Sequence, residues 1–418
     1  MKRRDVIKCL TILPIAEFSP FINWENPIID ESGSLFKSAT GKLLNADLHK
    51  KAFVMDGHIH MMTRQLIEGL DIGDRYPDGH VDIPRAIEGG LDAMFFSCYT
   101  PEPYYPDRHE VKNTFRVVEL ALAQIEKNNH LIELALTASD IISINRKGKM
   151  AAFLDLEGGF DLDGDLNILR SLYRLGLRSV QLTAHNETNA FIDSCYGEKR
   201  WGGLNAHGRD IVTEMNKLGM LINVSHASDD AILQTVEASK QPVIYSHGGF
   251  RGIVNSLRCI TDECAKALAA KGGVIGIQFG SSFNNPKYAQ WVESKRQPGS
   301  GMKAAPVERK PLTIEEVDQG ILKGLPFVHK EVIPDEVWMG VDQLARVIDY
   351  GVRLVGEDHI ALGSDFDGGP PLPREIKDVS DYPQMTYAMQ KLGYSDQRIR
   401  KILGLNWLRV IRQVTENG

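Results

Sequence analysis

Histidines and carboxylates occupy the positions directly after several short apolar runs of this 418-residue chain. Imidazole nitrogens and carboxylate oxygens are ligands that zinc and similar divalent ions take in proteins, and a carboxylate also serves as a general base. Their clustering after apolar runs therefore predicts a metal-dependent catalytic site. The residues concerned are His58, His60, Glu157, His185, His226, His247 and Asp365.

The spacing of these residues suggests how two ions would be held. In an extended strand, residues i and i+2 face the same way, so His58 and His60 are expected to bind one ion together. Glu157 ends an apolar run, where an unpaired charge is costly, and a position between two cations would remove that cost. His226 and His247 are then expected to hold the second ion. A lone His-x-His or Ser-His pair also fits packing in a core or at a surface, but the joint pattern favours a metal site.

The chemistry expected of such a centre is hydrolysis. Two ions roughly 3.5–4 Å apart share a bridging hydroxide, because metal binding lowers the pKa of water from about 15.7 towards 7, and they polarise a substrate carbonyl. Asp365 is expected to take the proton from that water and to pass it to the leaving amine. Nearby positive charge keeps such a carboxylate ionised until it is needed.

Eight apolar or β-branched runs must position these residues. Each ends in a polar or glycine-rich turn, and helical segments lie between them, which predicts an α/β protein, a (β/α)8 TIM barrel of the metal-dependent hydrolase type. A doubly wound open sheet fits the same alternation; the placement of the chemistry at the run ends favours closure. The expected strands are 53–55, 93–96, 151–154, 179–182, 221–224, 242–245, 274–277 and 360–362, and the clearest helices are 113–128, 166–175, 208–218 and 262–270.

Composition narrows the class of protein. The chain is 43% hydrophobic and 25% charged, as globular proteins are, and its net charge of −7 without a basic block argues against a nucleic-acid partner. No apolar run reaches the roughly 18 residues that a membrane span needs. Five cysteines do not make a disulfide framework. Cys98, Cys195, Cys259 and Cys264 are able to pair two by two, but their spacing does not decide this.

The N-terminal region differs from the rest of the chain. Arg3-Arg4-Asp5-Val6-Ile7-Lys8 fits a twin-arginine export motif, and a modestly apolar stretch follows at 9–16. We therefore expect residues 1–45 to be an export leader and N-terminal extension, and the protein to be periplasmic. If the leader is not functional, we expect the protein to be cytoplasmic. Residues 46–418 are expected to be one catalytic barrel. An insertion at about 281–340, rich in Pro, Lys, Glu and Gly, is either a lid on the active-site face or a solvent-facing excursion.

Several motifs resemble those of the membrane (renal) dipeptidase family, metallopeptidase family M19, within the amidohydrolase-like barrels. The resemblance runs from about Asp56 to Val410 and is highly specific because many motifs agree. They are Asp56-Gly57-His58, Glu157-Gly158-Gly159, Leu182-Thr183-Ala184-His185, the segments 218–226 and 242–247, Gly363-Ser364-Asp365-Phe366-Asp367-Gly368, and 378–383.

The resemblance implies a binuclear dipeptidase that acts on dipeptides with a free C-terminal carboxylate, with two divalent ions for which zinc is expected. It implies that Glu157 bridges the ions and that His185 stabilises the oxyanion. Arg258 aligns with the arginine that receives the substrate carboxylate, which its planar fork matches. Tyr99 is expected to form part of the pocket wall. A homodimer is also implied, although no segment of the sequence can be recognised as its interface.

The sequence departs from the family pattern at one metal ligand. Mammalian members usually have an aspartate where this chain has His60, and a neutral ligand in place of an anion leaves the site more positive. The metal preference and the substrate side-chain preference therefore do not carry over. The polar end of the sequence, residues 415–418, gives no signal for a lipid anchor.

Two other functions are open at this stage. The same site would serve an amidohydrolase acting on N-acyl amino acids, D-amino-acid derivatives or β-lactams. A single-metal or metal-free binding protein that kept the barrel is the alternative of another class, and His60 is the only residue that favours it.

Overall fold

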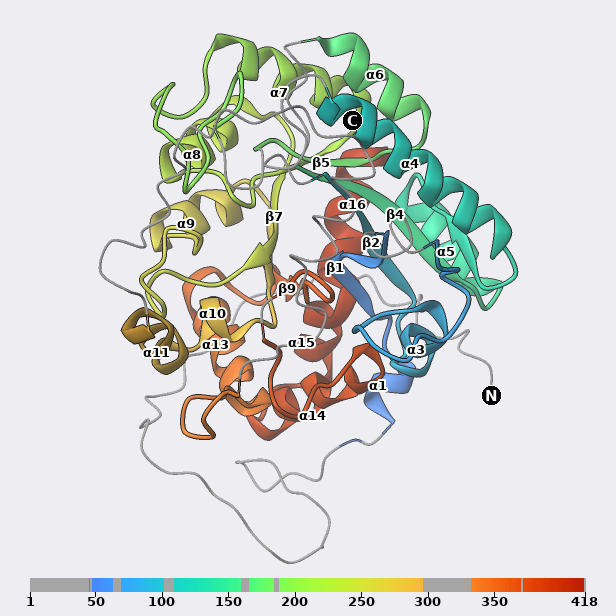
Figure 1. Ribbon diagram of the computed structural model, residues 1–418, viewed down its shortest axis with the longest axis vertical. Helices are drawn as coiled ribbons and strands as arrows, with labels where there is room; N and C mark the ends of the chain where they lie inside the picture. Colours follow the sequence, from blue (N-terminus) through green and yellow to red (C-terminus); the bar gives the residue numbers. More distant parts are fainter. Residues whose placement is uncertain are drawn as a thin grey trace, which may run out of the picture.

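The computed structural model describes residues 45, 47–62, 69–100, 109–158, 165–183, 188–295, 332–369 and 371–416. Within these residues, nine parallel strands form one sheet, and helices surround it (Figure 1). The strands are β1 Met55–Ile59, β2 Ala93–Thr100, β3 Ile132–Leu134, β4 Met150–Gly158, β5 Ser179–Gln181, β6 Leu221–Asn223, β7 Val243–Gly248, β8 Val274–Ile277 and β9 Ile360–Leu362.

The strand order closes the sheet into a barrel. Strands β1, β2 and β4 to β9 are neighbours in that order, and β3 pairs only with the start of β4. The segment after β9 returns to β1, where His60 N donates to Phe366 O at 3.0 Å and Asp365 N donates to His58 O at 2.9 Å. The predicted (β/α)8 barrel is confirmed, and the open doubly wound sheet is excluded because its edge strands would not meet.

The connections between the strands are mainly helical, as expected of parallel neighbours. Helix α9 has the predicted bounds, and Thr261 caps it by accepting from Cys264 N at 3.2 Å. The helices are α1 Leu48–Lys51, α3 Ile83–Glu88, α4 His109–Lys127, α5 Ala138–Arg146, α6 Leu166–Arg174, α7 Ala206–Leu218, α8 Asp229–Ala238, α9 Asp262–Ala270, α10 Ser281–Asn284, α11 Pro286–Lys295, α13 Val341–Val355, α14 Pro383–Lys391, α15 Asp396–Arg400 and α16 Asn406–Glu416, with a 3-10 turn at Val379–Asp381 and a π-helical turn at Lys401–Leu405.

Apolar packing closes the end of the barrel where the strands begin. Trp407 of α16 packs against Phe95 with ring centroids 5.1 Å apart, and its indole N–H donates to Leu362 O at 2.9 Å. Gly57 makes this possible, because a Cβ there would lie 2.3 Å from the Trp407 ring. With this end sealed, the polar side chains of the strands gather at the opposite end, where barrel enzymes carry their chemistry.

The structure differs from the sequence-based expectations in the extent of some elements. Strand β1 begins at Met55 and runs to Ile59, with an irregularity between Asp56 and Ile59, so that His58 lies within the strand rather than after it. Strand β3 was not predicted, because its three residues follow helix α4 closely. Residues 1–44 and the central part of the 281–340 insertion lie outside the described residues, so the leader and the lid remain predictions.

Two further expectations concern cysteines and membranes. Cys98, Cys195, Cys259 and Cys264 are free thiols, so the pairing left open by their spacing is not present among them. In the part of the chain that the structure describes, no helix has both the length and the apolar character for crossing a bilayer.

Candidate metal centre

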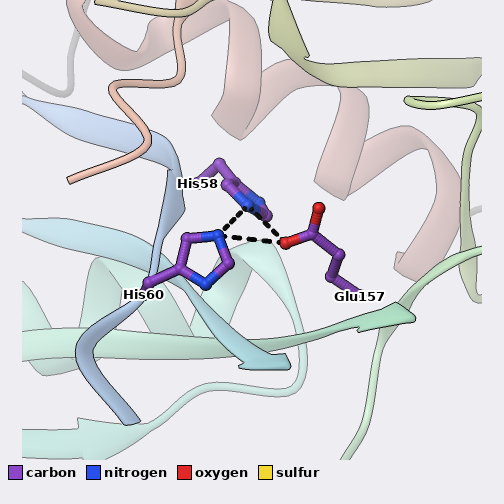
Figure 2. A group of neighbouring side chains, drawn as sticks. All are labelled: His58, His60 and Glu157. Carbon is purple, nitrogen blue, oxygen red and sulfur yellow. Dashed lines mark hydrogen bonds and ion pairs between the residues drawn. The ribbon is translucent and has the colours of Figure 1, made fainter. Parts of the chain in front are cut away.

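Two histidines of β1 and its end meet one glutamate of β4. His58 Nε2 lies 2.9 Å from Glu157 Oε2, and His60 Nε2 lies 3.0 Å from the same oxygen. The two Nε2 atoms are 3.1 Å apart (Figure 2). Three donor atoms, two from the β1 segment and one from β4, thus face one point.

The other oxygen of Glu157 faces a second pair of histidines. Glu157 Oε1 lies 3.2 Å from His226 Nε2 and 3.6 Å from His247 Nε2, and these two nitrogens are 3.3 Å apart. The four imidazoles and the carboxylate are almost completely buried. One carboxylate therefore spans two histidine pairs that come from β1, β7 and the turn after β6.

Asp365 completes the first half of the centre. Its Oδ1 lies 3.1 Å from His60 Nε2 and 3.8 Å from His58 Nε2. Its backbone is left-handed, with φ of 63°, and His226 has the same strained conformation with φ of 65°. Strain of this kind, of order 1–3 kcal/mol per residue, persists where surrounding structure enforces it, and it is typical of functional sites.

Serine hydroxyls hold two of the imidazole rings through their Nδ1 atoms, on the side of the ring away from the centre. Ser97 Oγ lies 2.9 Å from His58 Nδ1, and Ser246 Oγ lies 2.9 Å from His247 Nδ1. A partner at Nδ1 holds the ring and leaves Nε2 as the atom that faces the centre. The rings of His58 and His247 stack at 3.7 Å between centroids, which places the two halves of the centre side by side.

The electrostatics of the centre favour a cation. Burial opposes ionisation of Glu157, but the charges of His58 and His60 outweigh it and hold the pKa of this carboxyl well below its usual range. Burial, with His58 and Arg258 nearby, holds the pKa of His247 well below normal, so that its imidazole is neutral. Neutral imidazole and ionised carboxylate are the forms that bind metals.

The donor set fits divalent metal ions. Three groups of these residues bring ligand atoms within 4.8 Å of one another: His58, His60 and Glu157; His58, His247 and Asp365; and Glu157, His226 and His247. Unprotonated Nε2 atoms 3.1 Å apart repel each other through their lone pairs unless a proton or a cation lies near both. Nitrogen and oxygen donors without sulfur suit zinc and its neighbours in the first transition row.

Metal loading is expected to release protons and to weaken as the pH falls. Burial acts to lower the pKa of His58 and His60, but the charge of Glu157 and the other carboxylates raises them to about 10 and about 9. Both rings are therefore protonated at pH 7 without metal, and a ligand nitrogen must lose its proton. Calorimetry of zinc binding at pH 7, in buffers of different ionisation enthalpy, should show about two protons released per chain. Binding without proton release would contradict this.

The remaining predicted residues lie as follows. Arg258 is buried against the centre, where Nε donates to His226 Nε2 at 3.1 Å and Nη2 donates to His247 O at 3.1 Å. Tyr99, near the end of β2, packs edge-on against His60 with ring centroids 5.1 Å apart. The structure thus brings both to the predicted site. His185 falls in 184–187, outside the described residues, so its role as the oxyanion donor stays a prediction.

Sequence reasoning missed Gln278, which follows β8. Its side-chain N–H donates to Asp365 Oδ2, and the Asn284 side chain holds its backbone by donating to Gln278 O at 2.6 Å. Gln278 stands directly after an apolar run, as the predicted ligands do, so the same rule would have found it. It was missed because an amide is neither a strong metal ligand nor an acid or base.

Replacing Gln278 by alanine is expected to lower kcat about 10- to 100-fold, because a hydrogen bond to a charged group is worth roughly 1.5–3 kcal/mol. Asp365 would then lose the donor that holds Oδ2 away from the centre. The metal content and KM should stay within severalfold of the wild-type values, since the side-chain hydrogen bond of Gln278 goes to Asp365 and not to a proposed metal ligand or to Arg258. Steady-state kinetics with elemental analysis of the same samples checks this, and an unchanged kcat would remove Gln278 from the machinery.

A closed parallel barrel with buried imidazoles and carboxylates at the carboxyl end of its strands defines the class of metal-dependent hydrolases. The comparisons with known proteins give the family. The model of the membrane dipeptidase family, peptidase family M19, matches residues 44–418.

Dipeptidase tcpJ of Claviceps purpurea is 31% identical over 377 residues, which cover 86% of this chain and 77% of that protein. Dipeptidase verJ of Clonostachys rogersoniana is 29% identical over 350 residues, covering 81% and 76%. Among solved structures, the probable dipeptidase PvdM from Pseudomonas aeruginosa superimposes with a TM-score of 0.72 at 25% identity, covering 89% of this chain and 98% of that one. The chain therefore belongs to the membrane dipeptidase family. It is a metallopeptidase, a hydrolase that acts on peptide bonds.

Proposed function

We propose that this enzyme hydrolyses dipeptides with a free C-terminal carboxylate at a centre of two divalent ions, with zinc as the expected metal. The observation that carries the proposal is the position of Glu157. Its two oxygens face two different histidine pairs at 2.9–3.6 Å, which is the arrangement a bridging carboxylate requires.

Each half of the centre has its own residues. His58 and His60 would hold one ion, His226 and His247 the other, and Glu157 both. When bound, the two ions supply a hydroxide nucleophile at neutral pH and polarise the substrate carbonyl. The chain's own part is to fix these ligands, and the buried walls around them keep the local dielectric low, which strengthens every charge interaction in the site.

Asp365 is the proposed proton carrier. Its Oδ1 faces the histidines and lies 3.1 Å from His60 Nε2, while Oδ2 is held by Gln278. This leaves one carboxylate oxygen able to accept a proton beside the centre and to give it to the leaving amine. His185 is proposed to donate a hydrogen bond to the oxyanion, on the basis of the family motif alone.

Arg258 is the proposed receptor of the substrate carboxylate. The guanidinium is buried beside His226 and His247, and Tyr245 OH accepts from Nη1 at 2.8 Å. The lone pair of His226 Nε2 that accepts from Arg258 Nε is the one a metal ion would take. Metal binding would therefore free that N–H for a carboxylate, at a fixed place beside the scissile bond.

Replacing Arg258 by alanine is expected to raise KM for Ala-Ala about 10- to 100-fold, since charge-assisted hydrogen bonds contribute roughly 1.5–3 kcal/mol. The matched substrate is Ala-Ala amide, which lacks the carboxylate. The wild type should discriminate strongly between the two, and the variant should treat them nearly alike while keeping its metal. Undiminished discrimination by the variant would rule out this role, and a preference of the wild type for the amide would rule out the proposed substrate class.

The proposal extends to cellular location and assembly. Export to the periplasm is supported by Arg3-Arg4 and the apolar stretch at 9–16, and a cytoplasmic location follows if this leader is not functional. Residues 46–418 are proposed to act as a single catalytic unit, and the homodimer is proposed from the family resemblance.

A further inference from the structure

Asp155 is a buried carboxylate that the proposed mechanism does not use. It lies two residues before Glu157 on β4, so the two side chains leave the strand on the same face, with Asp155 one layer deeper in the barrel. It is completely buried, and neither carboxylate oxygen has a hydrogen-bond donor among the described residues. Its one ion pair within that part of the chain is with His58, whose Nδ1 lies 3.7 Å from Oδ2.

The surroundings of Asp155 do not compensate its charge. Its partners in register are Ser97 on β2 and Ser179 on β5, and the Ser179 hydroxyl is itself buried without a partner among the described residues. On its own strand the next inward position towards the strand start is Phe153, in the apolar layer under Trp407. Burying an unpaired carboxylate is costly, so its presence calls for a compensating positive charge.

Asp56 is a second fully buried carboxylate, and unlike Asp155 it has hydrogen-bond donors. Asp56 Oδ1 accepts from His58 N at 2.9 Å and from Ser364 N at 3.0 Å, so it ties β1 to the segment after β9. Its burial is explained by the backbone it holds. Among the described residues, Asp155 holds no backbone group, and its one charged partner is the His58 ring, whose other nitrogen faces Glu157.

We propose that Asp155 is a positioning residue of the metal centre, which supplies negative charge to the ions through the imidazole of His58. The carboxylate favours the tautomer with the proton on Nδ1, and Ser97 Oγ, 2.9 Å from that nitrogen, receives the hydrogen bond. This leaves Nε2 unprotonated towards the centre and makes it a stronger donor.

The charge balance of the centre supports this role, which rests on the proposed pair of ions. Two divalent cations bring four positive charges, and buried Arg258 adds one more beside them. Among the described residues, the carboxylates that face the centre, Glu157 and Asp365, supply two negative charges. Asp155 adds a third from the layer below, where it takes no coordination position away from substrate or water.

The test is metal affinity of Asp155→Asn, which keeps the size of the side chain and removes its charge. The matched control is Ser179→Ala, which changes a buried group in register with Asp155 whose hydroxyl has no hydrogen-bond partner among the described residues. Zinc binding by competition with a chromophoric chelator should be about 10- to 100-fold weaker in Asp155→Asn, as for other partners of metal-binding histidines, and unchanged in the control. The absorption spectrum of the cobalt-loaded variant should also shift, and its activity should recover as zinc is raised.

The outcomes separate this inference from the proposed function. Failure of the wild type to bind two ions would refute the metal centre itself. Wild-type affinity and an unchanged cobalt spectrum in Asp155→Asn would refute the role of Asp155 alone. So would lost activity that zinc does not restore, because this would indicate a structural role. If Asp155→Asn does not fold, Asp155→Ser is measured in the same way, and failure of both to fold also overturns the inference.

Discussion

Replacing Glu157 by glutamine is expected to lower kcat/KM at least about a thousandfold, a loss of roughly 4 kcal/mol of transition-state stabilisation. The two oxygens of this carboxylate face both histidine pairs, with His58 Nε2 at 2.9 Å on one side and His226 Nε2 at 3.2 Å on the other. Glutamine has the same shape, but its amide nitrogen does not ligate a metal. The variant should therefore keep fewer than two ions per chain, as measured by elemental analysis after dialysis.

Glu214→Gln is the matched control for this variant. Glu214 lies on α7 and pairs with Arg170 at 2.7 Å, so the substitution removes a glutamate charge without touching the centre. Its activity and metal content should equal those of the wild type. If Glu157→Gln retained two ions and activity within tenfold of the wild type, Glu157 would not be the bridging ligand.

Replacing Asp365 by asparagine is expected to lower kcat by about 10²- to 10⁴-fold, the usual contribution of a general acid–base group. The amide cannot accept the proton, although Gln278 and the left-handed backbone still hold the side chain. Metal content should stay near that of the wild type, because four histidines and Glu157 remain. Single-turnover kinetics with a chromogenic dipeptide measures the loss at the chemical step.

Asp367→Asn provides the control on the same turn. Asp367 has the same left-handed backbone, and its Oδ1 accepts from His80 N at 2.7 Å, which an asparagine oxygen also does. Its kcat should stay within severalfold of the wild type. Equal effects at Asp365 and Asp367 would show that the turn, rather than the proton acceptor, is what the enzyme needs. A loss of metal that parallels the loss of kcat at Asp365 would make this residue a ligand instead.

The fold was predictable because each barrel strand overlaps a short apolar or β-branched run in this sequence. The run at 274–277 and the helix at 262–270 agree with the structure at both ends. Strand β1 was expected at 53–55 but covers Met55–Ile59. The difference arises because the backbone of polar residues after the apolar run still pairs with β2. Hydrophobic periodicity does not predict where such a strand ends, since it locates apolar residues and not the end of backbone pairing.

The proposed ligands could be picked out from the sequence because imidazoles and carboxylates stand out after apolar runs. The layer that supports them could not. Ser97 and Asp155 lie within strands that are largely apolar, and the register between β2 and β4 brings both to His58. The register shift between Asp56 and Ile59 in β1, within which His58 lies, also leaves no sequence signal. Such contacts depend on which strands pair and in which register, and a single sequence does not give this information.

Titration of the metal-free enzyme with zinc tests whether Glu157 joins two metal ions at the carboxyl end of the barrel strands. Dipeptide turnover and bound metal are measured on the same samples. We predict two tightly bound ions per chain, with full activity only when both are present. Glu157→Gln should bind fewer than two ions and should not reach wild-type activity at any zinc concentration. Full turnover with a single bound ion, or with none, would contradict the account.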